Sequence, residues 1–120
     1  MSNFDIQNKT EHRPWGYYTV IAQGEGFLVK IIHVNSGQKL SVQSHNHRSE
    51  HWVVLSGVAD VWLRDKKYKL NEGESIDIKI KDKHSLQNST KSDLEILEVQ
   101  KGKILSEDDI IRYEDIYGRV

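Results

Sequence analysis

Two short runs of the chain combine histidine, carboxylate and amide side chains at spacings that suit a metal ion. The runs are Gly37-x5-Gln43-x-His45-x4-Glu50-x6-Gly57 and Gly73-x10-His84-x3-Asn88. Residues two apart on a strand project from the same face, so Gln43 and His45 would point together, and Glu50 would return on the next strand after a short turn. We therefore expect a metal pocket with Gln43, His45, Glu50 and His84 as ligands.

The donor types indicate which ion such a pocket would hold. Neutral imidazole, carboxylate and amide oxygen form a mixed nitrogen and oxygen set, which suits zinc, manganese, cobalt or iron. Because the amide is a weak ligand, coordination positions would stay open to water or substrate oxygens, as in catalytic sites. The alternative is that these are surface or satisfied core histidines, since the chain contains six.

The surrounding sequence predicts the strands that would position these residues. Short β-forming runs bounded by Gly, Asn, Asp or Ser cover residues 17–22, 27–34, 40–43, 50–55, 58–63, 67–70, 75–80, 84–87 and 94–100. Many short strands without a long helical period indicate an all-β fold, an antiparallel sandwich or jelly-roll barrel. Near the C-terminus, Ser106 followed by three acidic residues predicts a short helical turn. Residues 1–12 are expected to form a polar N-terminal arm, and residues 13–120 a single domain.

Composition excludes several classes of function. The net charge is −1, with 17 basic and 18 acidic residues spread along the chain, so no basic stripe or acidic tail would recruit nucleic acid or a charged membrane. The absence of cysteine removes disulfides and thiolate chemistry. No apolar leader or membrane span is recognisable, so we expect a soluble cytoplasmic protein.

Alternation along residues 50–55 places further side chains around the pocket. Glu50 and Trp52 share one face, so Trp52 is either a core residue or a wall for the substrate, whereas His51 faces away. His47 lies in the turn before Glu50 and is expected at the rim of the pocket.

The two glycine-bounded runs resemble the paired motifs of the cupin superfamily. There are two departures: Gln43 replaces the usual first histidine, and Lys79 and Lys81 stand where the second motif usually carries Pro-x-Gly. A narrower resemblance, to the cupin domain of type II mannose-6-phosphate isomerases, rests on residues 13–16, 39–52, 83–88, 98–100, 107–112 and 117–119. In that family the domain commonly follows a mannose-1-phosphate guanylyltransferase domain, so the present chain is expected to be a stand-alone isomerase module.

The resemblance implies a function and roles for named residues. It implies metal-dependent interconversion of mannose 6-phosphate and fructose 6-phosphate, with the four ligands named above and zinc as the frequent ion. Carried over to this chain, Arg112 is the positive charge near the reacting oxygens, Glu98 a base or orienter, and His47 another proton-transfer candidate. The pocket-mouth residues expected to bind the sugar phosphate are Arg13, Lys39, Ser41 and Arg48. The alternative for Arg112 is a salt bridge with an acidic neighbour.

Three other functions and the oligomeric state stay open. A nucleotide-sugar epimerase would need no metal and would use His and Tyr for acid–base catalysis. The presence of Gln43 and Arg112 counts against this function. An Fe(II) oxygenase would suit a His and carboxylate set, although Gln43 would weaken ferrous binding. A sugar- or metal-binding sensor without turnover is the third. We expect a homodimer formed by strand exchange or sheet packing.

Overall fold

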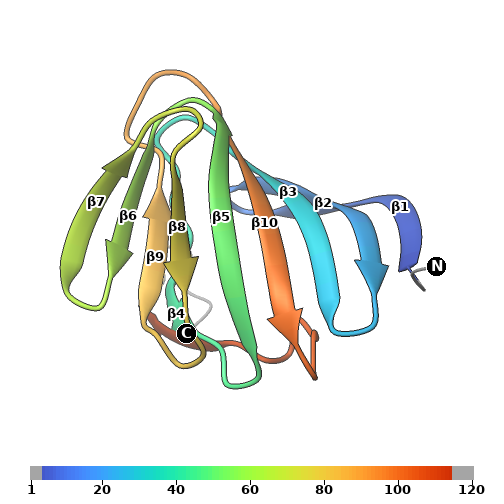
Figure 1. The fold of residues 1–120 in the computed structure, drawn as a ribbon. Coiled ribbons are helices and arrows are strands. Elements are labelled where there is room, and N and C mark those ends of the chain that lie inside the picture. Colours follow the sequence, from blue (N-terminus) through green and yellow to red (C-terminus); the bar gives the residue numbers. More distant parts are fainter. Residues whose placement is uncertain (1–3, 115–120) are drawn as a thin grey trace.

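The computed structural model describes residues 4–114, which form eleven strands in two antiparallel sheets (Figure 1). The strands are β1 (Phe4–Arg13), β2 (Gly16–Gly24), β3 (Phe27–Val34), β4 (Val42–Ser44), β5 (Arg48–Ser56), β6 (Ala59–Leu63), β7 (Lys66–Leu70), β8 (Ser75–Ile78), β9 (His84–Gln87), β10 (Leu94–Gly102) and β11 (Ile111–Glu114).

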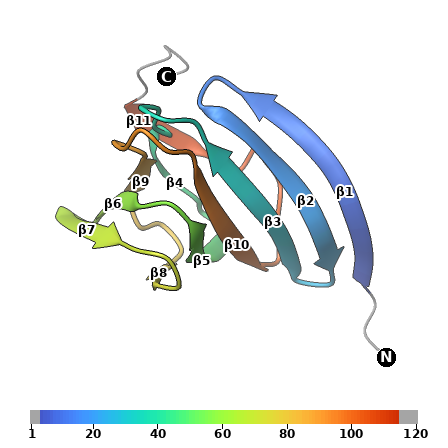
Figure 2. The same cartoon turned by 90° about the horizontal axis from the view of Figure 1, so that it is seen from above.

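The two sheets face each other as in a jelly roll. One sheet has six strands in the order β1-β2-β3-β10-β5-β8, and the other has five in the order β11-β4-β9-β6-β7. Figure 2 shows β1 and β2 extending away from the five-stranded sheet. The two sheets therefore form a two-layer barrel at one end of the molecule, and β1 and β2 extend the larger sheet at the other end. The predicted all-β jelly roll is confirmed.

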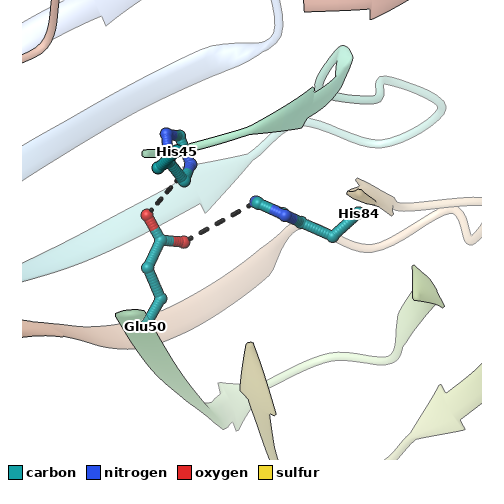
Figure 3. A group of neighbouring side chains, drawn as sticks. All are labelled: His45, Glu50 and His84. Carbon is teal, nitrogen blue, oxygen red and sulfur yellow. Dashed lines mark ion pairs between the residues drawn. The ribbon is translucent and has the colours of Figure 1, made fainter. Parts of the chain in front are cut away.

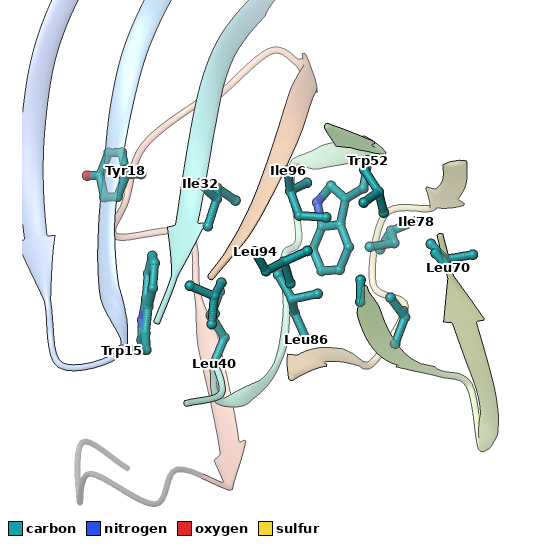
Figure 4. Close-up of a cluster of buried hydrophobic side chains, with 14 of the residues drawn as sticks. Trp15, Tyr18, Ile32, Leu40, Trp52, Leu70, Ile78, Leu86, Leu94 and Ile96 are labelled. Carbon is teal, nitrogen blue, oxygen red and sulfur yellow. The ribbon is translucent and has the colours of Figure 1, made fainter. Parts of the chain in front are cut away.

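Strict alternation of side chains explains how the core forms. In β5 and β10, every second residue is buried and the residues between them are partly exposed. The buried apolar side chains meet between the sheets (Figure 4) and include Trp52, Leu86, Leu94 and Ile96, each at most 2% exposed. Burial of such side chains is the main favourable contribution to folding, so this alternation fixes the register of each strand.

The ends of the chain differ from the sequence-based expectations. Residues 4–12 of the expected arm lie in β1, which pairs with β2 along the edge of the larger sheet. Its polar composition is compatible with an edge strand, because such a strand is only partly covered.

The expected helical turn is absent from residues 4–114, which contain no helix. Ser106 instead caps a single turn, in which its hydroxyl accepts the N–H of Asp108 at 3.0 Å and its carbonyl accepts the N–H of Asp109 at 3.0 Å. The chain then enters β11, and pairing of that strand with β4 takes the place of further helical hydrogen bonds. Within this part of the chain, no helix is long and apolar enough to cross a membrane.

Candidate functional site

His45, Glu50 and His84 meet inside the barrel (Figure 3), where their ligand atoms lie within 4.8 Å of one another. His45 follows β4, Glu50 lies in β5 and His84 begins β9. His45 Nε2 is 3.2 Å from Glu50 Oε2, and His84 Nε2 is 3.8 Å from Glu50 Oε1. All three side chains are at most 3% exposed. The second and third residues come from different sheets, so the group exists only when the two sheets have closed.

Backbone carbonyls set the orientation of both imidazoles. His45 Nδ1 is 2.7 Å from the carbonyl of Asp109, and His84 Nδ1 is 2.9 Å from the carbonyl of Asp82. A carbonyl only accepts, so each Nδ1 carries the proton and each Nε2 presents a lone pair toward Glu50. Burial, followed by the nearby Arg48 guanidinium, lowers the pKa of His45 to about 4, which keeps this imidazole neutral at physiological pH.

These donors fit a divalent cation. The Nε2 atom of His84 is buried and has no hydrogen-bond partner among the described residues. An unpartnered buried acceptor is costly, and a cation between two imidazoles and a carboxylate would satisfy it. The buried group can therefore hold a metal ion.

Gln43 lies beside this group. It is opposite His84 in the ladder between β4 and β9, is 8% exposed, and donates from Nε2 to the carbonyl of Ser41 at 3.4 Å. The two-residue spacing to His45 therefore brings both residues to the same pocket, whereas ligation by the Gln43 amide stays a prediction.

A buried network links Glu50 to a second carboxylate, Glu98 of β10. Trp52 Nε1 donates to both, at 3.1 Å to Glu50 Oε1 and 3.0 Å to Glu98 Oε2. Arg48 Nε donates to Glu50 Oε2 at 2.9 Å, and Gln100 Nε2 donates to Glu98 Oε1 at 2.7 Å. Burial, and then the charge of Glu50, raises the pKa of Glu98 above its usual range.

A small pocket of about 50 Å³ opens over this network. Its lining contains most of the residues predicted for catalysis or binding, namely Arg13, Ser41, Gln43, His45, Arg48, Glu50, Glu98 and Arg112. The other four predicted residues lie outside this lining. His84 is buried behind it, in contact with Glu50, and Trp52 is 2% exposed within the core. His47 is exposed in the turn between β4 and β5, and Lys39 forms a backbone β-bridge with Gln87.

Several lining residues were not predicted, above all Lys30. Its Nζ lies 3.0 Å from Glu107 Oε2, 3.8 Å from Glu98 Oε1, and 4.0 Å from the centre of the Tyr18 ring. The sequence could have indicated Lys30, because it lies two and four residues before Ile32 and Val34 on the same strand and so shares their buried face. A lysine on the inner face of a strand is rare unless it is paired or functional. Glu107, by contrast, reaches the pocket from an irregular segment that no periodicity describes.

Arg112 of β11 also lines the pocket. Its Nε is buried without a hydrogen-bond partner, and no carboxylate within residues 4–114 forms an ion pair with it. The expected alternative, a salt bridge with an acidic neighbour, is therefore not found in this part of the chain. A buried guanidinium N–H without a partner is available to an oxygen of a ligand.

Solved structures with similar folds support the architecture. The capsular polysaccharide assembling protein CapF of Staphylococcus aureus superposes with a TM-score of 0.78 at 16% identity, covering 89% of this chain and 34% of that one. The Cnp3 cupin domain of Schizosaccharomyces pombe superposes with a TM-score of 0.72 at 12% identity, covering 78% of this chain and 68% of that one. At these identities the likeness concerns the fold, which is a cupin fold.

Sequence comparison gives closer relatives. The chain is 50% identical over 116 residues to the alginate biosynthesis protein AlgA of Pseudomonas aeruginosa, covering 96% of this chain and 24% of that protein. It is 49% identical over 109 residues to the mannose-1-phosphate guanylyltransferase ManC of Salmonella typhimurium, covering 91% of this chain and 23% of that protein. The chain thus spans about a quarter of the length of these relatives. Residues 2–115 match the family described as mannose-6-phosphate isomerase C-terminal, and the chain therefore belongs to this family of cupin domains.

Proposed function

We propose that the chain is an isomerase that interconverts mannose 6-phosphate and fructose 6-phosphate with a divalent metal, zinc being the expected ion. The observation that carries this proposal is the placement of Arg112, with its unpartnered Nε, in the same pocket as the His45 and Glu50 donors. The family match supports the same reaction. Gln43 is proposed as the fourth ligand beside His45, Glu50 and His84.

The chemistry divides between the ion and the side chains. A bound cation would polarise the sugar carbonyl and stabilise negative charge that develops on its oxygen. Glu98 is proposed as the group that moves the proton between the adjacent carbons, because a carboxyl whose pKa is raised by burial is a better base and can return the proton. Arg112 would donate to the reacting oxygens of the sugar.

The size of the pocket implies a rearrangement during binding. About 50 Å³ accommodates one or two water molecules, whereas a hexose phosphate is several times larger. Glu107 from the segment before β11 presently places a carboxylate on the buried Lys30. We propose that the anionic substrate displaces Glu107, so that Lys30, Arg13 and Arg48 become available to its phosphate and hydroxyl groups. His47 and Lys39 would contribute only through movement of the rim.

Turnover after metal removal tests the proposal directly. The purified chain is treated with a chelator, and mannose 6-phosphate isomerisation is measured before and after zinc, manganese or cobalt is added singly. Metal-restored turnover is expected, and Arg112→Ala is expected to abolish most of it while metal content stays unchanged. Arg64→Ala is the matched control, because Arg64 lies on the surface and pairs with Asp82. Stoichiometric metal binding without turnover in the wild-type chain would contradict the isomerase.

A binding module without turnover is the second candidate. It is favoured by the small size of the pocket, in which the carboxylate of Glu107 is already paired with Lys30. In that case metal and sugar phosphate would bind, and Arg112→Ala would leave metal content and stability unchanged. Oxygen consumption in the presence of iron would instead indicate an oxygenase. A cytoplasmic location stays a prediction from the sequence.

A further inference from the structure

A groove of about 380 Å³ lies on the outer face of the five-stranded sheet, over β6, β7 and β9. Figure 1 shows β6 and β7 at the end of the molecule opposite β1. Along β6 the buried Val61 lies between Asp60 and Trp62, which therefore point away from the core. Directly opposed residues of paired strands share a face, so β7 and β9 add further outward side chains. The side chains that line the groove on this face are Asp60, Trp62, Lys67, Lys69, Ser85 and Gln87.

The first row of side chains across these strands contains an aromatic surface. Trp62 lies between Lys67 of β7 and Ser85 of β9 in the ladder. Its indole is partly exposed, and the indole N–H makes no hydrogen bond with any residue that the structure describes. A sugar ring has C–H groups on its faces and hydroxyls at its rim. It can therefore stack on the indole while its hydroxyls reach polar neighbours.

The second row supplies those polar neighbours. Asp60 lies between Lys69 of β7 and Gln87 of β9. The hydroxyl of Ser89 donates to Asp60 Oδ2, which orients the carboxylate. A carboxylate that accepts and an amide that both donates and accepts match the hydroxyls of a sugar. The Asp60 charge in the middle of the row would repel the phosphates of a nucleotide chain, so the row favours a saccharide over a nucleic acid.

The lysines of β7 indicate that the ligand is anionic. Lys67 and Lys69 are exposed, and neither forms an ion pair within residues 4–114. Two residues along a strand are about 7 Å apart, so the two ammonium groups attract negative charge at separate points. A phosphate site usually gathers several donors at one point, from arginine side chains or backbone N–H groups. Two separated lysines instead suit one carboxylate on each of two neighbouring sugars.

A tight turn holds this face in place without a ligand. Arg64 and Asp65 connect β6 to β7 with φ angles of 47° and 67°, as in a two-residue type I′ hairpin. Such a turn sets the register of the two strands, which keeps Trp62 opposite Lys67. Because the groove is already formed, binding requires little ordering of the backbone.

We propose that this groove is a second binding site, which takes an acidic oligosaccharide with carboxylates on neighbouring sugars. One sugar ring stacks on Trp62, and its hydroxyls bond to Asp60 and Gln87. The carboxylates pair with Lys67 and Lys69. The volume of the groove lies within the range of ligand pockets, about 300–1,000 Å³.

The groove is separate from the pocket that contains the candidate metal ligands. His84 and Ser85 are consecutive residues of β9 and point to opposite faces of the five-stranded sheet. The sheet therefore lies between the two sites, and the oligosaccharide site does not depend on the proposed isomerase.

Isothermal titration calorimetry with a hexamer of galacturonic acid tests the site. The wild-type chain is expected to bind the hexamer, and to bind it more weakly as the salt concentration rises. Trp62→Ala is expected to raise the dissociation constant at least ~10-fold, because a central aromatic side chain carries a large share of the affinity. A neutral hexamer of glucose is expected to bind at least ~10-fold more weakly than the acidic one. Thermal denaturation verifies that each variant is folded.

Charge reversal gives a second test that leaves the indole in place. The double variant Lys67→Glu, Lys69→Glu is expected to bind the acidic hexamer at least ~10-fold more weakly. The matched control is Lys91→Glu, Lys103→Glu, which changes the net charge equally at two exposed lysines outside the strands and should retain the affinity.

Four results would overturn the proposal. The first is no binding of the acidic hexamer at ~1 mM by the wild-type chain. The second is unchanged affinity in the Trp62→Ala variant or in the double variant of Lys67 and Lys69. The third is equal affinity for the neutral hexamer. The fourth is tighter binding of a single-stranded hexathymidylate, which would indicate a nucleic-acid site instead.

Discussion

The ammonium group of Lys30 lies 3.0 Å from the carboxylate of Glu107 and joins the inner face of β3 to the segment that precedes β11. Although burial alone would raise the pKa of Glu107, the Lys30 charge and hydrogen bond lower it. The Glu107 side chain is 50% exposed, whereas that of Lys30 is 6% exposed. The buried ammonium group of Lys30 is thus paired with the solvent-accessible carboxylate of Glu107, which another anion can replace.

Removing the Glu107 charge should therefore help an anionic substrate to bind. For Glu107→Gln we expect the KM for the sugar phosphate to fall about 3- to 10-fold, because a partly exposed ion pair contributes on the order of 1 kcal/mol. Asp108→Asn is the matched control, since the side chain of Asp108 is exposed and makes no ion pair with Lys30. An unchanged KM in steady-state assays would mean that Glu107 does not compete with the substrate.

Trp52 provides a different test, because its indole N–H is shared by Glu50 and Glu98. In Trp52→Phe both carboxylates lose this donor, and we expect the free energy of unfolding to fall by about 1–3 kcal/mol. Metal affinity should fall about 10-fold, as for other residues that orient a ligand. Trp62→Phe, on the outer side of β6, controls for the loss of an indole. Urea denaturation and zinc titration measure the two effects. If both variants behave alike, the shared hydrogen bond is unimportant.

The site shows which features a sequence can predict. Gln43, His45 and Glu50 were identifiable because a strand repeats every two residues and a short turn reverses the chain. His84 required a second motif, since only the pairing of β4 with β9 brings it opposite Gln43. The predicted strands 27–34 and 84–87 agree with β3 and β9 in full.

The features that were missed depend on tertiary contacts. Ser106 carries a capping signal, but a cap does not ensure that a helix follows, and after a single turn the chain enters β11, which pairs with β4. Trp52 was predicted as either a core residue or a wall for the substrate; it lies in the core, and its indole N–H contributes hydrogen bonds to two carboxylates of the site. The alternation of residues along a strand indicates which face a side chain is on, but it does not indicate which residues cover that face.

Asp93 gives a prediction about pH. Its hydrogen bond with His33, followed by that from the backbone N–H of Ser36, lowers its pKa below 3.8. A carboxyl whose pKa is lowered by folding stabilises the protein above its unfolded pKa, and this contribution is lost as the pH falls through the folded value. Asp93→Asn should therefore be less stable than the wild type at pH 6, and the difference should shrink as the pH falls through the lowered pKa of Asp93. Thermal denaturation over a series of pH values from 6 downward measures it. A difference that is constant with pH would exclude the ionised carboxylate as its cause.

His84 offers the sharpest test of the metal centre, because its Nε2 has no hydrogen-bond partner within residues 4–114 and lies 3.8 Å from Glu50 Oε1. Zinc at 100 times its dissociation constant should stabilise the wild-type chain by about 2.7 kcal/mol. In His84→Ala this zinc-dependent shift should disappear, whereas the metal-free variant should lose about 2–5 kcal/mol through the cavity left by the ring and the lost hydrogen bond from Nδ1 to the carbonyl of Asp82. His12→Ala, which removes an exposed histidine from β1, should retain the full shift. Differential scanning fluorimetry with and without zinc distinguishes these cases. An equal zinc shift in wild type and His84→Ala would show that the ion binds elsewhere.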